Sequence, residues 1–348
     1  MAEDEEGIDP LDLGIVHASL TQKKGPSEVG VVFNVGYGRA TVQASGLVNT
    51  SIIPLVNEQK VLLNGKEESC GYYSHSSIDA YARCAKQFEF RYVKKEKPRL
   101  AGRLKMMAGT AVHDATEHLL RQKLEGKVMP ENEYVDLIAD NINTAISDFD
   151  TRFKKAKAAG EDPLALDYGD RITDPKQFPR LYQRIGSVFY NTELPKVNVV
   201  DVEAMYIHHF PATGGGTIPL VGFIDLIEKI DGQLVITDHK VGAKKTQAEA
   251  DQSQQLALYS MAKDIPETAI NSFTLGTTGG KSEKNPKPGE FVKYRSRKTI
   301  RDYRRVSENI NAIMAGIKAG AFPRTGLHNP IVCSPSQCPY YEKCLGRG

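Results

Sequence analysis

The stretch IPLVGFIDLIEKIDGQLVITDHKVG, residues 218–242, decides the fold of this chain. Two runs rich in Val, Ile, Leu and Phe flank an Asp-Gly dipeptide at residues 231–232, which is a strong signal for a β-hairpin with a two-residue loop. Counting back along both strands from such a loop places Asp225 directly opposite Asp238. The sequence therefore predicts a hairpin in which two carboxylates face each other.

A lysine accompanies this carboxylate pair. Strand alternation places Lys240 on the same face as Asp238. Carboxylates at facing cross-strand positions, about 5 Å apart, repel each other unless a cation lies between them, and Mg²⁺ or Mn²⁺ takes oxygen ligands of this kind. A lysine beside such an ion can offset the charge of a phosphate. An exposed strand with ordinary charges is the alternative, but apolar residues surround these three on both sides.

Composition sets wider limits on the chain. Its 348 residues allow one large domain or two ordinary ones, and 40% hydrophobic with 25% charged residues is typical of a globular protein. No apolar run is long enough to span a bilayer, and the acidic start MAEDEEGIDP is unlike a signal peptide. We therefore expect a cytoplasmic protein with no membrane partner. The net charge of +2 does not by itself indicate nucleic-acid binding.

The chain is predicted to divide near residue 70. Residues 1–70 contain β-like runs broken by glycine and no chemical motif, so we expect a small β-rich appendage of unknown role. Residues 71–348 hold every motif and are expected to form the main domain. This part begins with SSIDAYARCAKQFEFRYV, residues 76–93, whose apolar residues recur three and four apart and predict a helix.

Two further helices contain polar pairs. GTAVHDATEHLLRQKL, residues 109–124, places His113 and Glu117 on one face at i and i+4. QAEADQSQQLALYSMAKD, which follows the hairpin, does the same for Gln255 and Tyr259. Taken alone, the second pair is most simply a surface glutamine beside a half-buried tyrosine.

The cysteines are gathered at the end of the chain. The segment VCSPSQCPYYEKC, residues 332–344, holds three of the five cysteines. In a reducing compartment, clustered cysteines more often bind metal than form disulfides. Three thiols make an incomplete site, so a fourth ligand has to come from elsewhere in the chain.

The motifs in this order resemble a known family. The series GTAVH (109–113), GFID (222–225), DHK (238–240) and QLALY (255–259) resembles the RecB-type branch of the PD-(D/E)XK nuclease superfamily. The helix with Cys84 and the cysteine-rich tail resemble the iron–sulfur subgroup of that branch, which includes AddB-type, CRISPR-associated and phage nucleases. The resemblance covers about residues 74–346. It implies an α/β, restriction-endonuclease-like fold: a mixed central sheet flanked by helices, with a C-terminal Fe–S segment packed on the first helix.

The resemblance also implies roles for individual residues. The side chains implied to take part in catalysis are Asp225, Asp238, Lys240, Gln255 and Tyr259. The implied ligands of a Mg²⁺ or Mn²⁺ ion are His113, Asp225, Asp238 and the backbone carbonyl of His239. Glu117 and Glu203 are implied to contact the ligands of this ion without binding the ion themselves. An ordinary surface charge is the alternative explanation for each.

The same resemblance implies a 4Fe–4S cluster. Its ligands are Cys84, Cys333, Cys338 and Cys344, and Cys70 is left over. The spacing Cys-x4-Cys-x5-Cys departs from the Cys-x2-Cys-x5-Cys of relatives, which leaves Cys70 as a substitute for Cys333. A Cys₄ zinc site is the competing explanation.

The implied function is a metal-dependent DNA nuclease, an exonuclease acting on single strands or DNA ends in recombination, repair or the processing of phage and mobile-element DNA. Basic stretches at residues 94–105 and 293–305 are predicted to contact that DNA. The chain has no GxxxxGK[ST] motif, so a helicase or other recombination protein is an expected partner. The alternative is a non-catalytic Fe–S subunit that binds DNA within a larger complex. The intact Asp–Asp–Lys set favours the enzyme.

Overall fold

A computed structural model describes residues 30–35, 38–43, 57–63, 66–167, 178–211, 217–276, 289–324, 326, 329 and 331–346. The chain forms two compact units, each built from several stretches of sequence. The first comprises Met1–Lys97, Ile207–Gly222 and Arg304–Cys333, and the second comprises Pro98–Tyr206, Phe223–Tyr303 and Ser334–Gly348. The predicted division at residue 70 stays a prediction.

The first unit contains a four-stranded antiparallel sheet. Its strands are β1 (Gly30–Val35), β2 (Gly38–Gln43), β3 (Asn57–Leu63) and β4 (Lys66–Tyr72), in the order β2-β1-β3-β4. Cys70 pairs with Gln59 in the β3–β4 ladder. The sequence placed β-structure in this part of the chain, and the strands lie where glycine-bounded β-like runs occur.

The first unit contains helices as well as this sheet. They are α1 (His75–Arg83), α2 (Ala85–Phe88), the π-helical turn η2 (Glu89–Val93) and most of α8 (Ile300–Lys318). The sequence predicted one continuous helix over residues 76–93, and the structure differs because Cys84 is extended, with φ −160°, and separates α1 from α2. Tyr81 Oη donates to the Ala321 carbonyl at 2.6 Å, and the rings of Phe88 and Phe322 are stacked. These contacts hold α1 and α2 against the segment that follows α8.

The central sheet has five strands in the order β5-β6-β7-β8-β9. Their bounds are β5 (Val199–Pro211), β6 (Thr217–Ile230), β7 (Gln233–Gly242), β8 (Glu267–Thr274) and β9 (Glu290–Arg297). β7 and β8 run parallel, whereas β6–β7 and β8–β9 are antiparallel, so the sheet is mixed as predicted. β8 is buried along both faces, which is typical of a strand beside a parallel neighbour with helices on each side.

The β6–β7 hairpin confirms the predicted register. Asp231 and Gly232 have φ of +51° and +83°, the two left-handed positions that a type I′ turn requires. The ladder runs from Ile230↔Gln233 to Leu226↔Thr237 without a slip. The next facing positions in this register are Asp225 and Asp238.

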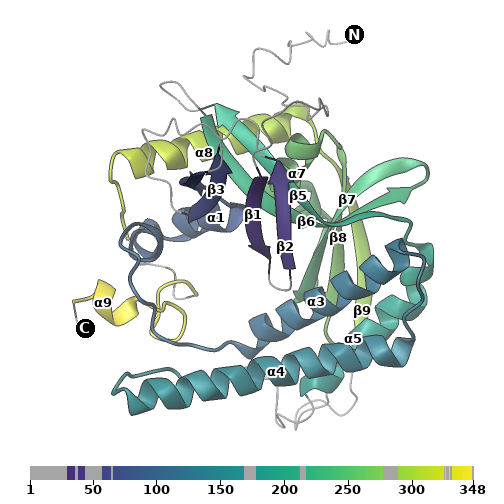
Figure 1. Cartoon of the computed structure of the whole chain (residues 1–348), viewed down its shortest axis with the longest axis horizontal. Coiled ribbons are helices and arrows are strands. Elements are labelled where there is room, and N and C mark those ends of the chain that lie inside the picture. The colour runs from purple at the N-terminus through teal and green to yellow at the C-terminus, as the bar shows by residue number, and fades with distance from the viewer. Residues whose placement is uncertain are drawn as a thin grey trace. The chain divides into compact units, whose positions relative to one another are not determined.

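The second unit also contains helices, several of which pack on this sheet. They are α3 (Leu104–Leu124), α4 (Glu131–Ala158), α5 (Phe178–Thr192), η4 (Leu194–Lys196), α6 (Gln247–Asp251), α7 (Gln254–Lys263) and α9 (Tyr341–Cys344). α4 lies along α3 and α5 (Figure 1), and the apolar faces of these three helices form one core that includes Phe273 of β8. α7 packs against β7 and β8. Within the described residues, no helix is long and apolar enough to cross a membrane.

Candidate active site

β7 presents different chemistry on its two faces. Asp238 and Lys240 point toward α7, where Lys240 contacts Gln255. His239 points the other way, into an aromatic pocket in which its ring lies edge-on to Phe189 and Phe273, with centroids 6.3 and 5.7 Å away. The period-two alternation of a strand therefore separates the charged residues of the DHK motif from its histidine.

The Lys240 ammonium lies between a carboxylate and an amide. Its Nζ is 2.8 Å from Asp238 Oδ2 and 3.1 Å from Asp238 Oδ1, and it donates to Gln255 Oε1 at 3.0 Å. Gln255 Nε2 in turn donates to Tyr259 Oη at 2.6 Å. Gln255 and Tyr259, the i, i+4 pair predicted on this helix, therefore extend the hydrogen-bond network of Lys240. The two hydrogen bonds of Gln255 define the orientation of its side-chain amide.

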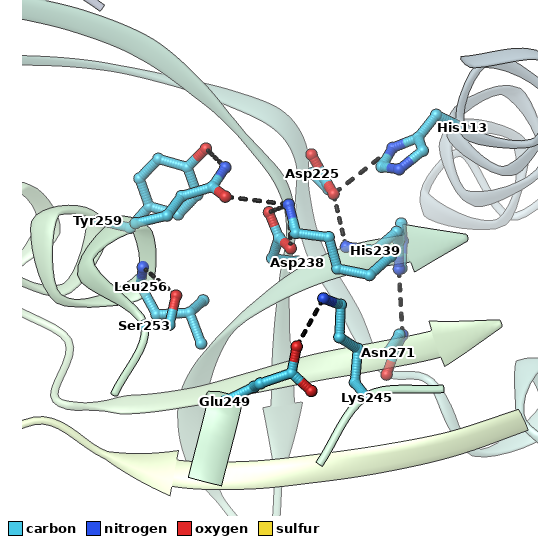
Figure 2. A network of polar contacts seen from close by, with 12 residues as sticks. His113, Asp225, Asp238, His239, Lys245, Glu249, Ser253, Leu256, Tyr259 and Asn271 are labelled. Carbon is cyan, nitrogen blue, oxygen red and sulfur yellow. Dashed lines mark hydrogen bonds and ion pairs between the residues drawn. The ribbon is translucent and has the colours of Figure 1, made fainter. Parts of the chain in front are cut away.

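Asp225 lies where β6 meets both β7 and α3 (Figure 2). Its Oδ2 accepts a hydrogen bond from the His239 backbone N–H at 2.6 Å and lies 3.6 Å from His113 Nδ1. Burial of the carboxyl group, followed by the nearby charge of Asp238, raises the pKa of Asp225 to about 8. The two carboxylates predicted from the hairpin therefore repel each other when both are ionised.

His113 projects from α3 toward this carboxylate. Burial lowers the pKa of His113, and the charge of Asp238 opposes that effect. The imidazole is therefore neutral at neutral pH, which is the form that can coordinate a metal ion.

The two glutamates flanking the site differ in their surroundings. Glu203 lies in β5 with a left-handed φ of +51°, a conformation that costs of order 1–3 kcal/mol and is often found at functional sites. Burial, then the charge of Asp225, raises the pKa of Glu203 to about 7. Glu117 instead pairs with Arg121 at 2.8 Å. The charge of Asp225 therefore acts on Glu203 by raising its pKa.

The carboxylates have the chemistry of a divalent-cation site. Asp238 Oδ2 is buried and accepts no well-oriented hydrogen bond within the described part of the chain, although Lys240 is at ion-pair distance. A hard cation bound there would compensate this oxygen and relieve the repulsion that raises the pKa of Asp225. Among the described residues, however, no three His, Cys, Asp or Glu side chains are already gathered to hold a metal ion. The complete ligand sets for Mg²⁺ or Mn²⁺ and for the iron–sulfur cluster stay predictions.

Asn271 is a site neighbour that the sequence did not reveal. It lies on β8 directly beside His239 in the parallel ladder, and its Nδ2 is 3.2 Å from His239 Nδ1. Both side chains are buried. The available signal was weak, because one asparagine within the short run ETAINSFT does not indicate its partner.

The cysteines lie in two places. In the first unit, Cys84 lies at the break between α1 and α2, next to Gly326. A Cβ at that glycine would be 3.5 Å from Cys84 Cβ and 2.8 Å from Cγ1 of Val332, the residue before Cys333.

In the second unit, the segment with Cys338 and Cys344 is held to the approach to α3. Arg103 Nη2 donates to the Gln337 carbonyl at 2.5 Å, and Arg99 N donates to the Pro339 carbonyl at 3.1 Å. The C-terminal cysteine segment is therefore anchored through its backbone.

Many cations of the two basic stretches, residues 94–105 and 293–305, pair with acidic side chains or donate to backbone carbonyls of the protein. In the stretch 293–305, Lys293 pairs with Glu228, Arg295 with Asp231 and Arg297 with Glu267, while Lys298 donates to backbone carbonyls. In the stretch 94–105, Arg99 pairs with Asp162 and Arg103 holds the C-terminal segment. Contact of either stretch with DNA stays a prediction.

Comparison with known proteins adds a family. No curated protein matches the chain. Among solved structures, one titled "Crystal structure of SSO0001" matches with 9% sequence identity, over 68% of this chain and 82% of that chain. Its TM-score of 0.24 is too low to support an argument. The family described as the PD-(D/E)XK nuclease superfamily matches residues 72–345, a span that includes the hairpin, the DHK motif and both flanking helices. The chain therefore belongs to the PD-(D/E)XK nuclease superfamily.

Proposed function

We propose that this protein is a metal-dependent deoxyribonuclease, specifically an exonuclease that acts on single strands or DNA ends in recombination, repair or the processing of mobile-element or phage DNA. Members of its superfamily are generally nucleases that use Mg²⁺ or Mn²⁺. The observation that best supports the proposal is the Lys240 ammonium, held between the buried Asp238 carboxylate and the Gln255 amide and next to the Asp225 carboxylate.

In this proposal Asp225, Asp238 and His113 hold the metal ion, together with the backbone carbonyl of His239. The bound ion would polarise a phosphoryl oxygen and lower the pKa of water. Lys240, partly exposed beside Asp238, would donate to the scissile phosphate and offset the charge that develops on it. Gln255 keeps the ammonium in this position, since its oxygen accepts one of the three N–H bonds.

We further propose a 4Fe–4S cluster bound by Cys84, Cys333, Cys338 and Cys344. Support comes from Gly326, where an added Cβ would lie 3.5 Å from Cys84 Cβ and 2.8 Å from Cγ1 of Val332, the residue before Cys333, so Cys84 and the start of the cysteine segment lie near each other within the first unit. Protein purified without oxygen is expected to contain iron and acid-labile sulfide in equal amounts. Finding stoichiometric zinc and no sulfide would show that these cysteines bind zinc and not an iron–sulfur cluster.

The nuclease proposal is tested by incubating purified protein with end-labelled single- and double-stranded DNA and Mg²⁺ or Mn²⁺. Lys240→Ala is expected to lower the cleavage rate by about 10²-fold or more, the scale for one activating group, with an unchanged unfolding midpoint. Lys244→Ala is the matched control, because this nearby lysine is exposed and pairs with Glu290 at the surface. If wild type leaves both substrates intact with either metal, the chain is a non-catalytic DNA-binding subunit. In that case a helicase or recombination partner would supply the activity of the complex.

A further inference from the structure

We propose that the buried Lys298 is a positioning residue for the Lys240–Gln255 pair, an inference that rests on the proposed nuclease function. Lys298 lies between β9 and α8, within the basic stretch 293–305, and is only 2% exposed. A buried ammonium is energetically costly unless its donors are satisfied. The oxygens that accept from the Lys298 ammonium indicate the role of this lysine.

Three neutral oxygens accept hydrogen bonds from the Lys298 ammonium. Nζ donates to the Ala250 carbonyl at 2.6 Å, to the Asp251 carbonyl at 2.8 Å and to Ser296 Oγ at 3.2 Å. The two carbonyls belong to the last residues of α6, where few backbone N–H groups remain to bind them; the Ala250 carbonyl accepts one such bond, from the Ser253 N–H at 3.3 Å. Lys298 therefore satisfies the end of α6 and links it to β9.

The end of α6 determines where α7 begins. Only Gln252 and Ser253 separate the two helices, and Ser253 is the N-cap of α7, with its hydroxyl accepting from the Leu256 N–H at 3.2 Å. Gln255 lies in this first turn. Its side chain reaches Lys240 across the space between α7 and β7, so a shift of the α6–α7 junction moves the amide that holds the lysine.

Removing the ammonium leaves the buried Ala250 carbonyl without its charged donor and with the longer hydrogen bond from the Ser253 N–H at 3.3 Å. Such a group is destabilising until the backbone moves to reach water or another donor. The junction can relax in this way because Asp251 and Gln252 are exposed. A displacement of about 1 Å at a reacting group can lower a rate by up to about 10²-fold. We therefore expect Lys298→Met to lower the DNA-cleavage rate by about 10- to 100-fold without removing any group from the site.

The matched control is Lys263→Met. Lys263 lies at the opposite end of α7 and also donates to a backbone carbonyl, that of Met205, at 2.8 Å. Its loss removes the same kind of bond, from a lysine to a backbone carbonyl, at a position on α7 eight residues from Gln255. Lys298→Gln is the second variant, to be used if Lys298→Met does not fold, because it keeps a polar group in place but is one bond shorter.

The experiment has two independent measurements on full-length protein. The first is the ¹³Cε and ¹⁵Nζ chemical shift of Lys240 in lysine-labelled protein, assigned by its absence in Lys240→Arg. Lys298→Met is expected to shift this signal in the same direction as Gln255→Ala, and Lys263→Met to leave it unchanged. The second is cleavage of end-labelled DNA with Mn²⁺. Here Lys298→Met should add less than about 2-fold to the loss already caused by Gln255→Ala, since both act through the same amide.

The outcomes separate this inference from the nuclease proposal. If wild type does not cleave DNA but the Lys240 signal responds as expected, the nuclease proposal fails and the positioning role stands. If Lys298→Met leaves the Lys240 signal in place, or lowers the cleavage rate equally with and without Gln255, the positioning role is overturned. Lys298 would then only stabilise the fold.

Discussion

Replacing Asp225 with asparagine tests the central feature of the site, two carboxylates facing each other across the β6–β7 hairpin. The change keeps the shape of the side chain and the oxygen that accepts from the His239 N–H. It removes one negative charge from a site where Asp225 is only 15% exposed and Asp238 only 3%. We expect the metal-free variant to be more stable than wild type.

The size of the effect follows from the geometry. Facing carboxylates about 5 Å apart repel each other by about 3 kcal/mol at an effective dielectric constant of about 20. Lys240 neutralises part of the Asp238 charge, and the His239 N–H stabilises the charge on Asp225. The repulsion alone is therefore expected to account for about 1–2 kcal/mol of the gain in the free energy of unfolding, after this offset from the Coulomb estimate, and relief of the buried charge on Asp225 adds to it.

The gain should depend on pH. The pKa of Asp225 is raised above its unfolded value, so its favourable contribution to wild-type stability is complete at low pH and is lost as the pH rises toward about 8. Below the unfolded pKa of about 3.8 the carboxyl group is protonated in both the folded and the unfolded protein, and the asparagine should bring little. Well above pH 8 the full gain should appear.

The assay is urea unfolding in EDTA at both pH values, with and without added Mn²⁺. Asp231→Asn is the control, because this aspartate lies at the tip of the same hairpin, 82% exposed, and pairs with Arg295. It should change stability by less than about 1 kcal/mol. Mn²⁺ should stabilise wild type and the control through binding, and should not stabilise Asp225→Asn. The reasoning is refuted if Asp225→Asn is neutral or destabilising at high pH and Mn²⁺ still stabilises it.

Two other substitutions test different parts of the molecule. Cys84→Ser is expected to lose iron and sulfide together and to make the C-terminal segment sensitive to protease; retention of both would remove Cys84 from the cluster. Lys293→Met would leave Glu228, which is 1% exposed and bound by this lysine at 2.9 and 3.0 Å, as an uncompensated buried charge. It should cost about 3–5 kcal/mol in urea unfolding. Adding Glu228→Gln should restore most of that loss, and an unrestored double variant would contradict the assigned cause.

Local pattern was enough to predict the hairpin and the residues on its faces. An Asp-Gly loop requires two left-handed residues and allows only one short-range register, so Asp225 and Asp238 could be placed opposite each other from sequence. The i, i+4 spacing predicted in the same way that Gln255 and Tyr259 share a face of a helix. These relationships hold because they join residues through one element or one tight turn.

Where local pattern competed with packing, the sequence was less reliable. The apolar spacing of residues 76–93 predicted one helix, yet Cys84 is extended, and the helix ends where its residues pack on the segment after α8. DNA contact by the basic stretch 293–305 stays a prediction, but the sequence did not indicate that several of its cations pair with acidic groups from β6, the hairpin tip and β8. Charge along one strand does not indicate which neighbouring element will neutralise it.

The sequence alone therefore determined the β6–β7 hairpin and the side chains that it carries, and the tertiary structure decided what holds those side chains. The contact between Lys240 and Gln255 depends on α7 lying over one face of β7. The contact between His239 and Asn271 depends on β8 joining β7 in parallel, and the support of α6 by Lys298 depends on where β9 ends. Each of these contacts joins segments distant in the chain. Their pairing is fixed by strand order and by the burial of opposite sheet faces, and no pattern within a single segment encodes either of these.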